Sequence, residues 1–156
     1  MLAGANSRIS DLVASRRARL VEREGDGAQV QPFAPDEELG YYDLAFGAWF
    51  LNYAQTKEEL TAVFENISLN LKPGGVFVGV VPHPTDDIGQ RAATYRAVPL
   101  SGLYPQNTYT EELASGNGWG LRVFRDDQGV DFMTCHMKKR VHGEAARRAG
   151  MRGKLE

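Results

Sequence analysis

The chain has 156 residues, a net charge of −2 and a sequence pI near 5.9, with 42% hydrophobic and 24% charged residues. This length suits one domain, so we expect residues 1–156 to form a single globular domain rather than a disordered chain. The slightly acidic balance excludes the broad positive field that nucleic-acid-binding proteins use, so no nucleic-acid partner is expected.

The sequence has no feature of a secreted or membrane protein. One cysteine, Cys135, cannot form a disulfide framework or a structural zinc site by itself, which fits a reducing compartment. No run of apolar residues is long enough to cross a bilayer. The N-terminus turns polar at Asn6 and Ser7, so it lacks the apolar core of a secretory signal. We therefore expect a cytoplasmic protein with no membrane partner.

The first predicted element is a helix that begins near Ser7 or Ser10, either of which can serve as N-cap, and ends at Gly25. A thin apolar stripe and a set of arginines make up this helix: Ile9, Leu12, Val13 and Leu20, with Arg16, Arg17, Arg19 and Arg23. An arginine cluster can bind anions, but a solvated helix face explains it more simply. Residues 28–33 then alternate as a strand does, and Pro32 places that strand at an edge or an end of its sheet.

The middle of the chain predicts a strand, a helix and a second strand. Residues 42–48 are nearly all apolar, which is typical of a strand buried on both faces. Thr56 and Glu59 have the spacing of a capping box. Apolar residues then recur at helical spacing: Leu60, Val63, Phe64, Ile67 and Leu71. Residues 72–75, Lys-Pro-Gly-Gly, end the helix and lead into an apolar strand at 76–81. Short connections make this a βαβ unit with parallel strands and a right-handed crossover.

The last part of the chain predicts a hairpin and a helix. Residues 83–118 are rich in Pro, Gly, Asp, Thr and Asn, so we expect mostly loop with one short helix over 86–95. Two strands are predicted near 120–126 and 130–137, followed by a helix over 138–149. Parallel strands early and a hairpin late indicate an α/β protein whose mostly parallel sheet has an antiparallel C-terminal edge.

Three stretches of the sequence resemble the latter half of class I S-adenosylmethionine-dependent methyltransferases. They are Tyr42-Asp43-Leu44-Ala45-Phe46, Leu51-Asn52-Tyr53-Ala54 and Leu71-Lys72-Pro73-Gly74-Gly75-Val76-Phe77-Val78. In that family an aspartate opens the fourth strand, a helix follows, and leucine-lysine-proline-glycine-glycine turns into the fifth strand. The resemblance covers residues 41–82 and is closest to the small-molecule methyltransferases of this Rossmann-like fold. Ala149-Gly150-Met151 is also similar to the family's alanine-glycine-phenylalanine helix ending.

The resemblance implies S-adenosylmethionine as cofactor and a binding site that includes Gly47, Ala48 and Trp49. These residues follow the first parallel strand, and open parallel sheets bind ligands beyond the carboxyl ends of their strands. Small residues there let the backbone approach an adenine, and Trp49 could stack on it or wall the pocket. In the alternative interpretation Gly47 and Ala48 allow close packing, and Trp49 is a core or interface residue. Asp43 is mainly structural in the family and is not assigned to catalysis.

One part of the family pattern has no counterpart in this sequence, namely the glycine-rich loop after the first strand. Asn6 would stand where the family has an acidic residue that binds both ribose hydroxyls, and an amide offers fewer strong acceptors than a carboxylate. Asp36 follows the third strand, where family members often place an acidic residue near the adenine amino group; a solvated acidic loop is the alternative. On this alignment the first strand, the glycine loop and the first helix are missing. We therefore expect an N-terminally truncated fold, with self-association through an exposed sheet edge.

Methyl transfer from a sulfonium needs alignment, and a general base only where the acceptor holds its proton, so no universal catalytic residue exists. His83 follows the last parallel strand, on the substrate side of this topology. It could act as a base or orient the acceptor, although a loop histidine without a role is the alternative. Tyr95, Tyr104 and Tyr109 lie in the segment that usually covers the acceptor in the family, and they could line a pocket or close it.

Other chemistries find little support. A metal site is rejected, because the spacing of His136 and His142 is wrong for one helical face, and Cys135 and His136 point to opposite sides of a strand. Neither a G-x-S-x-G elbow nor a phosphate-binding G-x-x-x-x-G-K-[ST] loop occurs. The leading hypothesis is an enzyme that transfers a methyl group directly from S-adenosylmethionine to a small-molecule acceptor. The alternative is a non-catalytic remnant that acts as a binding module. A nicotinamide-dependent oxidoreductase is disfavoured, since it too needs a glycine loop.

Overall fold

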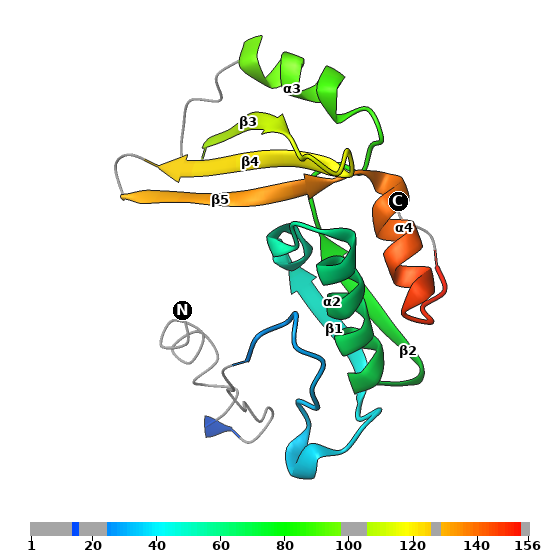
Figure 1. Ribbon diagram of the computed structural model, residues 1–156. Helices are drawn as coiled ribbons and strands as arrows, with labels where there is room; N and C mark the ends of the chain where they lie inside the picture. Colours follow the sequence, from blue (N-terminus) through cyan, green and yellow to red (C-terminus); the bar gives the residue numbers. More distant parts are fainter. Residues whose placement is uncertain (1–13, 16–24, 98–105, 126–128, 154–156) are drawn as a thin grey trace.

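The computed structural model describes residues 14–15, 25–97, 106–125 and 129–153 (Figure 1). Their elements, in chain order, are η1 (Pro35–Glu37), β1 (Tyr42–Ala48), η2 (Phe50–Tyr53), α2 (Lys57–Asn70), β2 (Leu71–Val80), α3 (Ile88–Ala97), β3 (Gln106–Glu112), β4 (Gly118–Arg125), β5 (Val130–Met137) and α4 (Lys139–Arg148). β1 and β2 form a parallel sheet, and β3, β4 and β5 form an antiparallel sheet in that order. None of the described helices has the length and apolar character needed to cross a bilayer.

The predicted βαβ unit is confirmed as β1, α2 and β2. The Thr56 side chain caps α2 by accepting a hydrogen bond from the Glu59 N–H at 3.1 Å. The Glu59 carboxylate in turn accepts one at 2.7 Å from the N–H of Gln55, the residue before the N-cap. The start of α2 thus has reciprocal hydrogen bonds similar to those of a capping box. The apolar side of α2, which includes Leu60 and Phe64, is buried in the core. β1 and β2 are therefore connected by a helix that lies on one face of their sheet.

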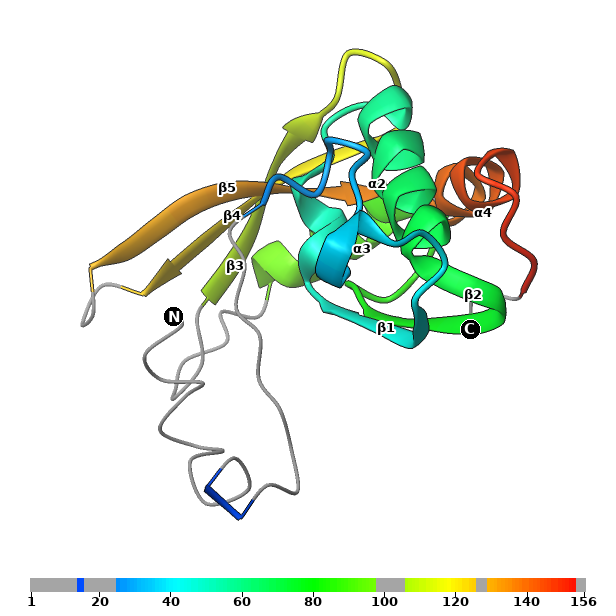
Figure 2. The same cartoon turned by 90° about the horizontal axis from the view of Figure 1, so that it is seen from below.

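The opposite face of the β1–β2 sheet is exposed. Figure 2 shows α2 and α4 on the same side of the two strands. On the other side Leu44 and Phe46 of β1 are 59% and 67% exposed. The prediction that residues 42–48 are buried on both faces is therefore wrong in the part of the chain that the structure describes. A continuous apolar run can form a strand without specifying what covers its second face.

The predicted strand over residues 28–33 is also wrong. This segment runs along α2 and is bound by two amide side chains of that helix. The Asn66 Oδ1 accepts a hydrogen bond from the Gln31 N–H at 3.1 Å, and the Asn70 Oδ1 accepts one from the Phe33 N–H at 2.7 Å. The Asn70 Nδ2 also donates to the Gln31 carbonyl at 2.8 Å. Because these side chains satisfy the backbone groups, the segment does not pair with β1 as a strand. Apart from Ala14, Ser15 and Gly25, the predicted helix from Ser7 or Ser10 lies outside the described residues.

The predicted hairpin is confirmed as β4 and β5, but it belongs to a sheet of its own. Its third strand, β3, falls in the region predicted to be mostly loop. β3 is polar in sequence, and Tyr109 is the one buried residue among its seven. Its sequence therefore lacks the alternation of apolar and polar residues that predicts a strand. The described strands thus form two sheets, and the expected antiparallel edge of one parallel sheet is wrong.

α3 covers the second sheet by packing Ile88 and Ala92 against Tyr109 and Leu121. The predicted helices over 86–95 and 138–149 are confirmed as α3 and α4.

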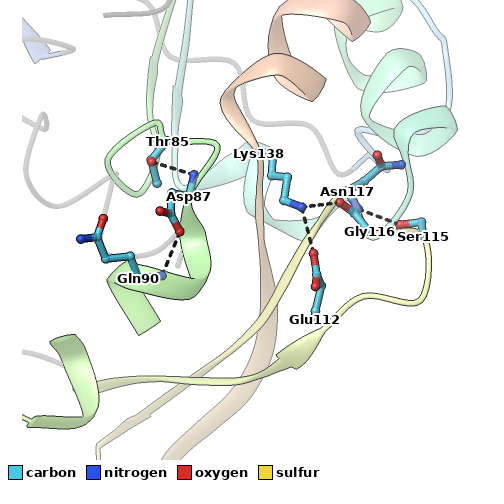
Figure 3. A network of polar contacts seen from close by, with 8 residues as sticks. All are labelled: Thr85, Asp87, Gln90, Glu112, Ser115, Gly116, Asn117 and Lys138. Carbon is cyan, nitrogen blue, oxygen red and sulfur yellow. Dashed lines mark hydrogen bonds and ion pairs between the residues drawn. The ribbon is translucent and has the colours of Figure 1, made fainter. Parts of the chain in front are cut away.

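Lys138 joins the antiparallel sheet to the start of α4 (Figure 3). Its Nζ donates to Glu112 Oε1 at 2.8 Å and to the Gly116 carbonyl at 2.7 Å. Its backbone N–H donates to the Asn117 carbonyl at 2.8 Å. The turn between β3 and β4 is therefore fixed to the helix that packs on α2.

We predict that Asn70→Ala destabilises the protein by about 1–3 kcal/mol, because the Phe33 N–H and the Gln31 carbonyl lose their partner. Urea unfolding followed by circular dichroism measures the change. Gln90→Ala is the matched control, since Gln90 is an exposed amide residue on another helix. Equal stability of the two variants would show that the segment before β1 does not depend on Asn70.

Candidate functional site

The carboxyl ends of β1 and β2 carry an aromatic residue in an unusual backbone conformation. Trp49 follows β1 with φ 58° and ψ 11°, a left-handed conformation that costs energy for any residue other than glycine. Its N–H donates to the Val80 carbonyl at 2.7 Å, which fixes the turn to the last residue of β2. Its side chain is 51% exposed. The structure therefore holds an indole outside the core at the end of the sheet where α/β proteins bind ligands.

Gly47 and Ala48 lie on opposite faces of β1. A Cβ at Gly47 would lie 3.2 Å from the Phe77 ring and 3.3 Å from Phe50 Cβ, so close packing alone accounts for a glycine here. Ala48 is exposed on the other face. Of the three adjacent residues assigned to the cofactor, Trp49 is the one with a large side chain available at the strand end.

The loop between β2 and α3 is held in place by capping interactions. The Asp86 Oδ1 accepts a hydrogen bond from the Arg140 N–H at 2.9 Å, at the start of α4. The Asp87 Oδ1 accepts one from the Gln90 N–H at 3.0 Å, at the start of α3 (Figure 3). Both carboxylates are thus engaged at helix N-termini, where negative charge is stabilised. His83, in the same loop, is exposed.

A buried polar cluster connects α3 with the antiparallel sheet. The Tyr109 Oη lies 2.7 Å from His136 Nδ1, and the Arg91 Nε donates to the same oxygen at 3.1 Å. Tyr109 is 3% exposed and His136 is 1% exposed. Burial, with the positive charge of Arg91, lowers the pKa of His136 from 6.5 to about 4, while the backbone of His83 acts in the opposite direction. His136 is therefore neutral near pH 7.

The Tyr109 oxygen is the centre of this cluster. It accepts a hydrogen bond from the Arg91 Nε and lies within hydrogen-bond distance of His136 Nδ1, where the tautomer of His136 sets which of the two groups donates. The His136 Nε2 is buried, and no described group forms a hydrogen bond with it. Tyr109 was predicted to lie in the segment that covers the acceptor, whereas His136 was given no role, because nothing in the linear pattern connects the two residues.

A second histidine lines a cavity between α4 and β2. His142 is 3% exposed, and burial lowers its pKa from 6.5 to about 4. Its Nδ1 has no hydrogen-bond partner among the described groups. The cavity measures about 470 Å³ and is lined also by Phe64 of α2 and Phe77 of β2. In the described ranges, no group of three or more His, Cys, Asp or Glu residues is placed to hold a metal ion.

Asp36, another predicted site residue, lies at the other end of this sheet. Asp36 belongs to η1, and the chain then passes Gly40, whose N–H donates to the Leu69 carbonyl beside the amino end of β2. Figure 1 likewise shows this segment at the end of β1 opposite its arrowhead, so Asp36 and Trp49 lie at opposite ends of the strand. Asn6 and Tyr104 lie outside the described residues, as does the side chain of Tyr95.

Comparisons with known proteins give a result at the level of fold. No protein-family model matches the chain, and no curated protein sequence matches it. Among solved structures, the chain is similar to an S-adenosylmethionine-dependent methyltransferase from Clostridium acetobutylicum ATCC 824, with a TM-score of 0.54 and 13% identity. The match covers 92% of this chain and 58% of that one, so the chain spans somewhat more than half the length of the solved structure. The chain therefore has a methyltransferase-like α/β fold.

We predict that the two buried histidines make the protein less stable in acid. Each has a folded pKa of about 4 and an ordinary value of 6.5, so the unfolded chain binds more protons between these two values. The free energy of unfolding should therefore fall as the pH falls from about 6.5 towards 4, by at most about 3 kcal/mol for each histidine. Urea unfolding midpoints between pH 7.5 and 4.5 measure this slope.

The variant His136→Gln, His142→Gln should have a flatter profile over that window, because it has no imidazole left to protonate on unfolding at these positions. Gln90→Ala is the control, since Gln90 is exposed and does not titrate, so its replacement should keep the slope. An unchanged slope in the double variant would show that other groups cause the acid sensitivity.

Proposed function

We propose that the chain is the S-adenosylmethionine-binding part of a methyltransferase that acts on a small molecule. The observation that carries this proposal is Trp49, an exposed indole held in a left-handed turn at the carboxyl end of β1. The methyltransferase-like fold and the named activity of the Clostridium acetobutylicum structure support it. The net charge of −2 argues against a nucleic-acid acceptor, and the sequence resemblance is closest to the small-molecule methyltransferases.

The residues at this end of the sheet fit part of the cofactor. Trp49 offers an aromatic face on which an adenine can stack, just beyond Ala48 at the end of β1. Asp36 belongs to the segment at the other end of β1, so we assign it no part in this site. When bound, S-adenosylmethionine supplies a methyl group on a sulfonium, which an acceptor attacks in line. The contribution of the protein is then to hold the two reactants in that alignment.

His83 is the residue that we assign to proton transfer. It lies in the loop after β2, whose two carboxylates, Asp86 and Asp87, are engaged with helix N-termini and are poorly placed to act as bases. The exposed imidazole of His83 does not cap a helix, so it can accept the proton of an acceptor hydroxyl or amine. Tyr109 and His136, both buried, would support this loop from beneath rather than contact the acceptor.

A second candidate function is a non-catalytic interaction domain with the same fold. The observation that favours it is the exposed apolar face of the β1–β2 sheet, on which Phe46 is 67% exposed. Exposed apolar surfaces of this kind mark sites of protein association. Cofactor binding distinguishes the two candidates, because an interaction domain has no need of S-adenosylmethionine.

We predict saturable binding of S-adenosylmethionine and S-adenosylhomocysteine to the full chain in isothermal titration calorimetry. Trp49→Ala should weaken this binding about tenfold or more, because stacking of a base on an aromatic ring contributes about 1–3 kcal/mol. Phe132→Ala is the control, since Phe132 is an exposed aromatic residue on the other sheet. Absence of binding by a chain with a cooperative unfolding transition would exclude the enzyme and leave the interaction domain.

A further inference from the structure

The exposed face of the β1–β2 sheet is an uninterrupted apolar array. Parallel pairing places three residues of β1 beside three of β2: Leu44 with Val76, Phe46 with Val78 and Ala48 with Val80. The five larger side chains are between 40% and 67% exposed. All six residues of this array, which we call the open face, are apolar.

The open face is unusual for a parallel sheet in water. Such sheets normally have both faces covered, whereas α2 and α4 lie on the same side of this one (Figure 2). With five large side chains that expose roughly 100 Å² each, the open face presents on the order of 500 Å² of contiguous apolar surface. A patch of this size on a folded domain is typically an interaction site.

We propose that the open face binds the open face of a second copy of this chain, which forms a symmetric dimer. Two such surfaces packed against each other remove on the order of 1,000 Å² from water, which reaches the lower limit for a specific protein interface. A twofold axis needs a self-complementary surface, and an array of flat apolar pairs without a charge satisfies this condition. Sheets pack face to face at a spacing of about 10 Å through side chains of this kind.

Pairing of two copies through the edge of β1 is less favourable than face-to-face packing, because it leaves the open faces exposed. Among the described strands β1 pairs with β2 alone, so its second edge could pair with a strand of another copy. Twofold pairing of β1 with β1 of a second copy would produce a four-stranded sheet. Both open faces would then lie side by side on one surface of that sheet and would remain in water. Face-to-face packing is favoured because it is the arrangement that buries them.

The N-terminal part of the chain, outside the described residues, is a poor alternative cover. Its apolar stripe is thin: Ile9, Leu12, Val13 and Leu20. Arg16 shares the helical spacing of that stripe, at three residues after Val13 and four before Leu20. A helix placed over Phe46 and Val78 would therefore bring a guanidinium to an apolar array. A second open face brings no charge.

Sedimentation equilibrium of the full chain between about 1 and 200 μM tests the proposal. The expected result is a concentration-dependent dimer. Phe46→Glu and Phe46→Lys, each placed at the middle pair of the open face, should weaken self-association about 100-fold or more by burying like charges near the twofold axis. An equimolar mixture of the two variants should recover the dimer, because the opposite charges then face each other.

Phe132→Glu is the matched control, because it changes an exposed phenylalanine in the antiparallel sheet and should leave the dimer intact. Urea unfolding of each variant separates loss of association from loss of folding. A monomer throughout the concentration range for the unmodified chain would overturn the proposal. Dimers that persist in both Phe46 variants would overturn it equally, since another surface must then form the contact.

Discussion

The packing of α2 on one face of the β1–β2 sheet is the contact on which the rest of the structure depends. The rings of Phe64 and Phe77 meet edge to face, with centroids 6.1 Å apart, and this pair lies between helix and sheet. The same core includes Met137 at the end of β5 and Val141 in α4, both almost fully buried. One cluster thus joins the parallel unit to the last strand of the antiparallel sheet and to the final helix. The antiparallel sheet has a smaller core of its own beneath α3.

This one-sided core also positions the candidate site. Leu51 of η2 is 2% exposed and belongs to the main cluster, whereas Trp49, two residues earlier, is 51% exposed. The change from exposed indole to buried leucine within one turn requires the sharp reversal that the left-handed conformation of Trp49 provides. Across from it, Asp86 attaches the loop after β2 to α4, which the same cluster holds. Rigid elements on both sides therefore define the end of the sheet where a ligand would bind.

Elements that depend on interactions between neighbouring residues were predicted from the sequence, whereas elements that depend on residues far apart in the chain were not. The βαβ unit was predictable because its signals are local: helical spacing in α2, the cap at Thr56 and the turn before Val76. β3 was not, because its stability comes from pairing with β4 and from one buried residue, Tyr109. The segment at residues 28–33 alternated like a strand, yet side chains of α2, more than thirty residues away, bind its backbone instead.

In the candidate site, too, features set by local sequence were predictable and contacts between distant residues were not. Trp49 and His83 could be located from the sequence, because the ends of parallel strands follow directly from the βαβ pattern. The contact between Tyr109 and His136 spans 27 residues and depends on the register of three strands, which the sequence does not display. Asp36 was assigned by resemblance alone, and the structure places its segment at the other end of β1.

The open face and the candidate site are not independent, because one strand supplies both. Successive residues of β1 alternate between the two faces, so Gly47 packs under Phe77 while Ala48 belongs to the open face, and Trp49 follows at once. A partner on the open face would immobilise the strand that carries the strained turn. Strained conformations persist where their surroundings determine them, so a covered β1 would hold Trp49 more firmly than an uncovered one. An interaction surface and a ligand site on this strand can therefore support each other, and a single chain need not have only one of the two functions.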